Sequence, residues 1–494
     1  MSSEFRQRRR CSVGVPSVSF GAVTVVNEKH FHFLLATNKV SELLEGLVVR
    51  RRMPYCLCLV EPESFVMMFS LSAQHLGLRR IAAIALATVV LGVATGLAGI
   101  ALSYLLHGVQ HLAYGYSPGQ IISRETFLDG VSASPPWRRL CALVVCGLVG
   151  GGGWWLLFRY GRPLVNIKKA VEADDPRMPL LSTFCHVLLQ IVTVALGSPL
   201  GREVAPREAG AAMAGWLGHR LQLAPRDRQI LVACAAGAGL AAVYNVPLAG
   251  ALFTMEVLLG SFAWWVAAPA VTMSTLAAVV AWIGLGNEHQ YQVPAWSITP
   301  ALIVWALLSG PLFGAVAWGY SEIAKRARAR APKRWPLPLL MLINCAVIGV
   351  FVIWFPQLPG NGKGAASLSF DNRLGIGLAA VLLALKMIFT TSSLRAGASG
   401  GLLTPGLANG ALLAIVLGGG WNMLWPGTSP GAFAIVGATA FLASSMQMPL
   451  TAIMLVFEFT RIDHDFLVPM LLAVAGALVT FRLIGHAATA PLRD

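Results

Sequence analysis

Long apolar stretches, separated by short basic or Pro/Gly-rich breaks, recur along the chain from about Leu78 onward. A helix needs about 20 apolar residues to cross the hydrocarbon core of a bilayer. Several stretches are shorter than that or are interrupted by Gly and Pro, which favours tilted and re-entrant helices over a row of identical spans. The pattern therefore predicts an all-α polytopic membrane protein. Examples of the stretches are Ile81–Leu106, Val266–Ile283, Leu302–Tyr320, Leu374–Leu385 and Phe466–Phe481.

The first 76 residues follow a different pattern. They carry two arginine triplets, Arg8–Arg10 and Arg50–Arg52, and no apolar run long enough for a span. No signal peptide is visible, because the charged start is not followed by an apolar core. We interpret residues 1–76 as a basic N-terminal extension. It is either disordered or the product of a start codon upstream of the true one, for which Met53, Met67 and Met68 are candidates.

Composition supports a membrane protein. Of the 494 residues, 56% are hydrophobic and 12% are charged, whereas soluble domains carry about 25% charged residues. The net charge of +15 is concentrated in short loops at 159–169, 220–228 and 325–333. Basic loops beside apolar spans usually lie in the cytoplasm, so we place 325–334 there. The charge is thus a topology signal, and the expected partner is a lipid bilayer rather than nucleic acid.

The sequence shows no constellation that would hold a cofactor or carry out catalysis. The Cys56 and Cys58 pair has no partners at metal-site spacing, and five of the other cysteines stand in apolar segments. Glycine triplets at 151–153 and 418–420 are not followed by Lys-Ser/Thr, as a nucleotide-binding loop requires. No hydrolytic triad is visible. We expect no metal, no cofactor and no enzyme activity.

An internal repeat organises the apolar region. Residues 234–256 match residues 436–458 at a shift of 202, and both segments contain a Pro-Leu pair and end in glutamate. Residues 197–211 match 397–411 at a shift of 200 through shared glycines. The alternative is a chance likeness of Ala/Gly-rich helices. The two matches predict two inverted-topology repeats, 77–285 and 286–494, with about eighteen helical segments and broken helices that meet near the midplane.

The first glycine break, Gly197–Gly201, is followed by an ionisable pair, Arg202 and Glu203. A charged residue at membrane depth is costly and is therefore a functional candidate. A helix that begins inside the protein also presents unpaired N–H groups and the positive end of its dipole, which together bind anions. An ionised Glu203 can occupy that anion site, and its protonation would release the site. The alternative is a solvated salt bridge in a loop.

The equivalent break in the second repeat, Gly397–Gly401, leads into Leu402, Leu403 and Thr404. Two such helix starts can converge on one ion and supply amide donors rather than a full charge. A site of this kind selects anions yet releases them. The alternative is that these glycines only allow close packing of helices.

These motifs resemble those of the CLC family of chloride channels and chloride/proton exchangers. GREVAP at Gly201–Pro206 resembles the family's GREGP, whose glutamate is the gating carboxylate. GLLTP at Gly401–Pro405 is similar to the family's GxFxP, and YGRP at Tyr160–Pro163 stands where GSGIP is expected. AAVYNVPLAGALFTME at 241–256 resembles the helix that follows. The similarity runs in order from about residue 80 to 490.

The resemblance implies chloride transport gated by Glu203, without a C-terminal regulatory domain, by a multi-pass protein of the bacterial inner membrane. It also implies a homodimer with one pathway in each subunit and an interface around 248–283 and 449–484. The anion-binding residues that it implies are Tyr160, Gly161, Gly201, Arg202, Glu203, Leu402, Leu403 and Thr404.

The chain departs from the family pattern near the ion. Tyr160 fills the family's serine position, Leu403 replaces the aromatic residue of GxFxP, and Val204 with Ala205 replaces a single glycine. The family's C-terminal tyrosine, which contacts the central ion, has no counterpart, because the last tyrosine is Tyr320. We therefore expect an inner anion site that is looser than in other family members, or one lined by backbone and apolar groups alone.

Proton coupling is the other departure. Exchangers of the family often carry two adjacent glutamates, the second of which relays protons from inside; here Glu256 fills the first place and Val257 the second. An aliphatic residue cannot carry a proton, which favours channel-like or weakly coupled movement. The alternatives are an exchanger in which Glu208, Glu256 or His486 replaces the relay, a fluoride-selective member, or a carrier of another anion. For Glu256 and its repeat equivalent at 458 we expect a structural role at a helix terminus.

Overall fold

A computed structural model describes residues 62–117, 122 and 125–489 of the chain. The chain divides into two units, residues 1–72 and 73–494, and apart from the first residues of helix α2 everything below concerns the second. The extension assigned to residues 1–76 lies mostly outside the described residues, and so does Met53 among the alternative start codons.

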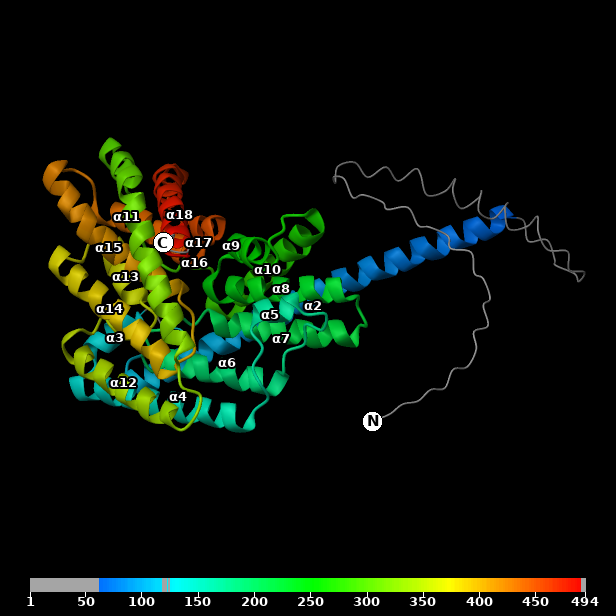
Figure 1. Ribbon diagram of the computed structural model, residues 1–494, viewed down its shortest axis with the longest axis horizontal. Coiled ribbons are helices and arrows are strands. Elements are labelled where there is room, and N and C mark those ends of the chain that lie inside the picture. Colours follow the sequence, from blue (N-terminus) through cyan, green and yellow to red (C-terminus); the bar gives the residue numbers. More distant parts are fainter. Residues whose placement is uncertain (1–61, 118–121, 123–124, 490–494) are drawn as a thin grey trace, which may run out of the picture. The chain divides into compact units, whose positions relative to one another are not determined.

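The described residues fold into seventeen α-helices, with two short helical turns of other kinds (Figure 1). The helices of the first half are α2 (Pro62–Tyr114), α3 (Phe127–Ala133), α4 (Pro136–Tyr160), α5 (Ile167–Glu172), α6 (Leu180–Ala195), α7 (Val204–Arg220), α8 (Pro225–Tyr244), α9 (Pro247–Phe253) and α10 (Trp264–Leu285). A π-helical turn, Thr254–Leu258, continues α9. The helices of the second half are α11 (Pro300–Ala329), α12 (Pro336–Trp354), α13 (Lys363–Phe370), α14 (Ile376–Ala396), α15 (Leu403–Leu424), α16 (Pro430–Met446), α17 (Pro449–Thr460) and α18 (Leu467–Thr489). A 3-10 turn, His464–Phe466, precedes α18.

The helices fall into two length classes, as the interrupted apolar pattern predicts. Among the described residues, eight helices are long and apolar enough to cross a membrane: α2, α4, α10, α11, α12, α14, α15 and α18. Shorter apolar helices (α6, α9, α16 and α17) lie among them. The all-α, polytopic fold predicted from the sequence is confirmed.

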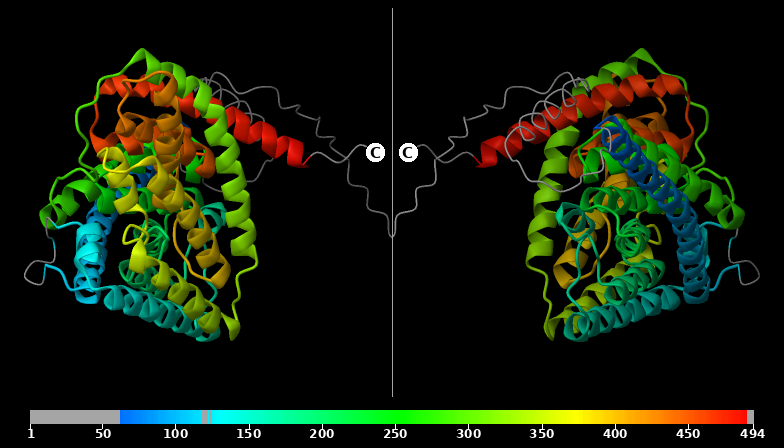
Figure 2. Two further views of the ribbon diagram at one scale, coloured as in Figure 1. Left: turned by 90° about the vertical axis from the view of Figure 1, so that its left-hand side faces the viewer. Right: turned by 90° about the vertical axis from the view of Figure 1, so that its right-hand side faces the viewer.

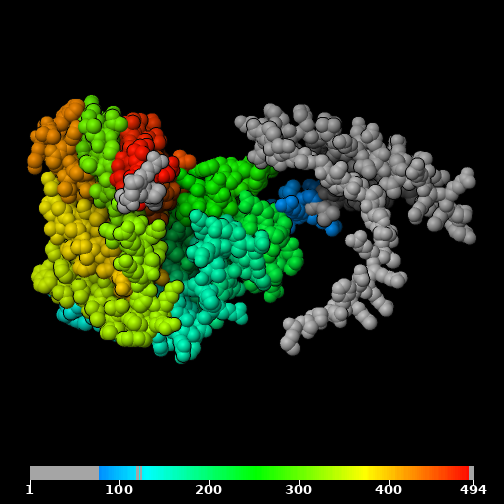
Figure 3. Space-filling model, in the orientation of Figure 1, coloured from blue at the N-terminus to red at the C-terminus, as the bar shows by residue number. Residues whose placement is uncertain are grey.

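The order of elements repeats from α2–α10 to α11–α18, with α3 as an extra helix in the first half. Repeat-related helices also touch: α4 packs along α12, and α9 packs against α17 (Figure 1, Figure 2). Contacts between equivalent elements are what a twofold relation between the halves requires. The two halves meet along a continuous seam in the space-filling view (Figure 3).

The same local chemistry breaks the chain at equivalent places. Helix α8 ends on Asn245 and α16 ends on Gln447, both in the left-handed conformation with φ of 57° and 53°. A proline two residues later begins the next helix, at Pro247 and Pro449. A left-handed C-cap followed by proline at the first helical position is a strong stop-and-restart signal. The breaks are therefore encoded locally in each half.

Small residues let the central helices approach closely. Every residue of α8 from Ile230 to Tyr244 is buried, and so is every residue of α16 from Gly431 to Ser444. Both stretches are rich in Ala and Gly, which permit tight helix packing without interdigitating large side chains. Large apolar side chains such as Ile283, 85% exposed, face outward instead, as lipid contact requires. Small residues along these two helices thus let backbone groups approach each other inside the protein.

Candidate anion site

The glycine breaks of the two repeats meet directly. The N–H of Gly201 donates to the carbonyl of Gly401 at 2.8 Å, and the N–H of Gly401 donates to the carbonyl of Gly201 at 2.9 Å. These two bonds form an antiparallel bridge, outside any longer strand of the described chain. The convergence of the two breaks predicted from the sequence is confirmed.

The carboxylate of Glu203 lies at the beginning of the opposite repeat's helix. Glu203 is fully buried, and its Oε1 accepts a hydrogen bond of 2.7 Å from the backbone N–H of Leu403, the first residue of α15. Its Oε2 has no hydrogen-bond partner. A helix N-terminus favours negative charge because its first amides are unpaired and its dipole is positive there. The side chain thus occupies the place where that helix start would hold an anion.

Glycine at both ends of the bridge leaves room for the carboxylate that lies against them. A Cβ added at Gly201 or at Gly401 would collide with the carboxyl group of Glu203. The motif glycines are therefore explained by the close approach of a charged side chain to two backbone segments.

The two arginines next to Glu203 do not neutralise it by direct pairing. The Arg202 guanidinium lies over the Tyr244 ring, 5.1 Å from its centroid. Arg207 lies over the Phe253 ring at 4.9 Å and donates from Nε to the backbone carbonyl of Glu203 at 2.8 Å. The recorded hydrogen bond to the carboxylate comes from an amide, which suits exchange with a mobile anion better than a full ion pair does.

Thr404 and Leu402 complete the start of α15. The Thr404 hydroxyl lies 3.2 Å from the Tyr244 hydroxyl, and both side chains are buried. Leu403 is fully buried, and Leu402 caps the helix from the residue before it. Tyr244, the last residue of α8, thus adds a hydroxyl near the helix start that the motif comparison did not single out.

Tyr160 and Gly161 lie elsewhere. Helix α4 continues through Tyr160, whose side chain is 77% exposed, and Gly161 closes that helix by donating to the carbonyl of Leu157. An exposed ring does not reach the buried carboxylate of Glu203. The structure therefore does not bring Tyr160 together with the residues that surround Glu203.

Two buried polar side chains missed by the sequence reasoning lie deeper in the second half. The Tyr320 hydroxyl and both amide atoms of Asn409 are buried without hydrogen-bond partners among the described residues. The hydroxyl lies beside Asn409 and Thr390. Buried polar atoms in an apolar region are costly unless they are paired, so this group of side chains is a candidate for a polar contact. An isolated Asn in the apolar helix α15 was the available signal.

The glutamates that end the repeated segment have a structural role, as predicted. Glu256 accepts hydrogen bonds of 3.0 and 2.7 Å from the backbone N–H groups of Leu450 and Thr451, at the start of α17. Glu458 accepts bonds of 3.0 and 2.8 Å from Leu248 and Ala249, at the start of α9. Each repeat therefore caps a helix of the other.

A buried lysine supports the first glycine break. Lys386 of α14 donates from Nζ to the carbonyls of Leu358 and Gly360, at 2.9 and 3.2 Å. The N–H of Gly360 in turn donates to the carbonyl of Gly197 at 3.0 Å. The loop before α13 is thus tied to the break that leads to Glu203.

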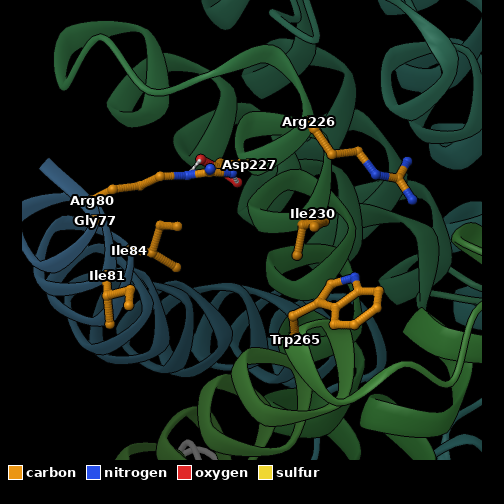
Figure 4. Close-up of a pocket in the computed structure, with 8 residues that line it drawn as sticks. All are labelled: Gly77, Arg80, Ile81, Ile84, Arg226, Asp227, Ile230 and Trp265. Carbon is orange, nitrogen blue, oxygen red and sulfur yellow. Dashed lines mark hydrogen bonds and ion pairs between the residues drawn. The ribbon is translucent and has the colours of Figure 1, made fainter. Parts of the chain in front are cut away.

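A cavity of about 450 Å³ lies apart from these residues, among α2, α8 and α10 (Figure 4). Arg80 and Asp227 face each other across two hydrogen bonds of 2.7 Å on its wall. Its lining shares no residue with the site around Glu203. The lining residues are Gly77, Arg80, Ile81, Ile84, Arg226, Asp227, Ile230 and Trp265.

Comparison with known proteins agrees with this geometry. The profile of the family described as voltage gated chloride channel matches residues 141–482. A putative chloride channel protein ClcB-like from Ralstonia nicotianae is 28% identical over 418 residues, which cover 81% of this chain and 93% of that protein. An H(+)/Cl(-) exchange transporter ClcA from Vibrio campbellii is 28% identical over 374 residues, covering 72% of this chain and 78% of its own.

Two solved structures share the fold. A slow cyanobacterial Cl⁻/H⁺ antiporter superposes with a TM-score of 0.69 and 19% identity, covering 82% of this chain and 95% of its own. A CLC-type fluoride/proton antiporter superposes with a TM-score of 0.59 and 19% identity, covering 81% and 96%. At this level of identity the two structures support the architecture alone.

Proposed function

Because the chain belongs to the voltage gated chloride channel family, we propose that it moves chloride across the membrane and that Glu203 is its gate. One observation carries the proposal: the Glu203 carboxylate accepts the hydrogen bond of the first amide of α15, where a small anion would bind. An ionised Glu203 and chloride then compete for the same donors. Protonation removes the charge, weakens the bond to Leu403 and opens the place to the ion.

Around this gate the chain provides backbone amides and hydroxyls, with the guanidinium groups of Arg202, Arg207 and Arg328 held nearby by other partners. The N–H of Leu403 donates to the Glu203 carboxylate at the start of α15. The hydroxyls of Thr404 and Tyr244 lie at the same helix start, 3.2 Å from each other. Tyr320 and Asn409 add a buried hydroxyl and a buried side-chain amide. Neutral donors bind an anion weakly enough to let it leave. We propose that Tyr320 takes the part of the family's missing C-terminal tyrosine.

The finer properties of transport are also proposals. Val257 packs among apolar residues at the position of the family's relay glutamate, which favours channel-like movement if no other route carries protons. The names of relatives include a chloride channel, a proton/chloride exchanger and a fluoride/proton antiporter. We propose chloride as the ion, a homodimeric assembly, and location in a bacterial inner membrane.

The test is chloride flux by purified protein in liposomes across a range of pH, with wild type and Glu203→Gln. Glutamine mimics the protonated gate, so we expect the flux of the variant to be insensitive to pH and to exceed that of wild type at neutral pH. Glu322→Gln, at a carboxylate paired with Arg326 on the surface of α11, is the control and should behave as wild type. Unchanged flux and pH dependence in Glu203→Gln would refute the gate.

A further inference from the structure

Helix α6 carries a buried polar stripe on an otherwise apolar helix. Thr183, His186, Gln190 and Thr193 recur at spacings of three and four residues, so they lie on one face of the helix. All four are buried. The Thr183 hydroxyl and the side-chain amide oxygen of Gln190, Oε1, have no hydrogen-bond partner among the described residues. Membrane helices bury such groups at a cost, so a stripe of them indicates a polar path rather than simple packing.

A carboxylate of α7 faces this stripe. Glu208 is buried and its Oε2 accepts a hydrogen bond of 2.8 Å from Nε2 of Gln190. Nε2 of His186 lies 3.7 Å from the same oxygen. The indole N–H of Trp154, on α4, donates to Nδ1 of His186 at 3.1 Å. Since an indole can only donate, Nδ1 accepts and the ring hydrogen lies on Nε2, directed at Glu208.

The surroundings of Glu208 isolate it from other acids. From α6 it faces Gln190 and His186, and from its own helix Arg207 is close enough for its charge to act on the carboxylate. The α2 and α6 residues that pack with this stretch of α7 at Ala205 and Ala209 are apolar. No charged group of α2, α5 or α8 is recorded in contact with Glu208 within the described residues. About a tenth of its side chain, 11%, remains accessible.

The position of Glu208 suits a connection between the gate and the cytoplasm. It follows Glu203 by five residues on α7, a rise of about 7.5 Å. Helix α7 then runs to the basic loop at 220–228, and the loop just before α6 lies beside it, with Asp175 3.6 Å from Arg228. By the positive-inside rule both loops face the cytoplasm. The stripe and Glu208 therefore lie between the cytoplasmic ends of α6 and α7 and the gate.

We propose that Glu208 is the proton-carrying residue that links Glu203 to the cytoplasm, in place of the relay glutamate missing at Val257. This inference rests on the proposed gating role of Glu203 and makes the protein a proton-coupled exchanger. A proton from cytoplasmic water binds one carboxylate oxygen of Glu208. The same proton then passes through water to Glu203, so no charge accumulates at Glu208. His186 keeps its own hydrogen and acts as a positioning residue that directs Nε2–H at the carboxylate.

The other two residues that could replace the relay glutamate, Glu256 and His486, lie in positions less suited to passing a proton to Glu203. Glu256 is engaged by the amides at the start of α17. His486 lies at the exposed end of α18. Glu208 alone among these three is buried next to the gate on the gate's own helix.

The decisive experiment measures proton and chloride fluxes together in liposomes under a chloride gradient. We expect wild type to drive protons against their gradient. Glu208→Gln should lower proton flux about tenfold or more while chloride flux stays within about threefold of wild type, as expected for loss of a single proton-transfer group. Glu208→Asp should restore part of the proton flux. His186→Gln should lower the proton-to-chloride ratio and shift its pH profile.

Glu256→Gln is the matched control and should keep the wild-type proton-to-chloride ratio. If Glu208→Gln fails to fold, Thr183→Val tests the same path, because it removes a buried hydroxyl that has no partner and keeps the side-chain shape. A wild-type ratio in Glu208→Gln, or in Thr183→Val where it replaces that variant, would overturn the proposal. Absence of proton flux in wild type would also overturn it. The gate proposed at Glu203 would still stand if Glu203→Gln abolished the pH dependence of chloride flux.

Discussion

A single side chain, Glu203, organises the chemistry of the site at the scale of residues. Its carboxylate accepts one hydrogen bond from the backbone amide of Leu403, and it fits there because Gly201 and Gly401 have no side chains. The net gain from such a charge-assisted hydrogen bond is modest, about 1.5–3 kcal/mol. A bond of that size can be exchanged for an anion, whereas a buried ion pair would leave an expensive unpaired charge behind.

Crowding at Gly401 can be used to displace the gate without changing its charge. In Gly401→Ala the new methyl group would occupy the space of the Glu203 carboxyl, so the side chain must leave the start of α15. We expect chloride flux at neutral pH to rise and its pH dependence to fall, measured in the same liposome assay. The control is Gly420→Ala on α15, where an added Cβ meets no atom within 4 Å. Equal behaviour of the two variants would contradict the crowding argument.

At the scale of elements, helix ends rather than helix faces make the contacts between the two repeats around Glu203, Glu256 and Glu458. Helix α15 offers its first amide to a residue of the other repeat, and α9 and α17 do the same with their own starts. These ends are available because Gly, Asn and Gln stop the preceding helices in the left-handed conformation. Broken helices therefore supply helix starts that Glu256 and Glu458 cap permanently, and in our proposal the start of α15 supplies an exchangeable anion site.

The permanent caps should contribute stability and not transport coupling. Glu256→Ala removes the acceptor for the amides of Leu450 and Thr451, a loss that typically costs about 1–2 kcal/mol. We expect a lower thermal unfolding midpoint in detergent, with Glu256→Gln intermediate because it keeps one oxygen acceptor. A variant with unchanged stability and altered ion flux would contradict the structural assignment.

Much of this element-level organisation could be predicted from one sequence. The Pro and Gly breaks act locally, so they reveal where helices stop, and the matches at shifts of 202 and 200 pair them across the halves. The outward position of Tyr160 could not be foreseen, because a motif alignment does not show that α4 continues through it and turns its ring to the surface. Tyr320, Asn409 and Lys386 were missed because long-range packing brings them near the site, and no local pattern records that.

At the scale of the whole molecule, the outer surface is apolar on most of its long helices. Leu450 on α17 and Leu471 on α18 are 47% and 52% exposed, in segments expected to face a second subunit. Lipid contact accounts for exposed apolar residues elsewhere. The glycine bridge and both glutamate caps form within a single chain. We therefore expect a dimer to hold two independent pathways rather than one shared pathway.

The dimer can be tested by particle mass. Two chains of 52.5 kDa give 2 × 52.5 = 105 kDa, which light scattering distinguishes from a monomer after correction for detergent. Leu450→Trp together with Leu471→Trp should shift the mass to that of a monomer, because bulky indoles disrupt close packing between subunits. Leu339→Trp, 50% exposed on α12, should leave the dimer intact. A monomeric wild type, or monomers from Leu339→Trp alone, would contradict the predicted interface.

The paired glycines also limit how the protein can work as a machine. Two backbone hydrogen bonds join the glycine breaks of the two halves beside Glu203. Many carriers expose their cargo to each side in turn by rocking one half against the other. Here such rocking would have to break this glycine bridge, whereas a swing of one carboxyl group leaves it whole. Under the gating role proposed for Glu203, access to the ion is controlled by a side chain that turns beside this bridge, while the bridge itself stays closed.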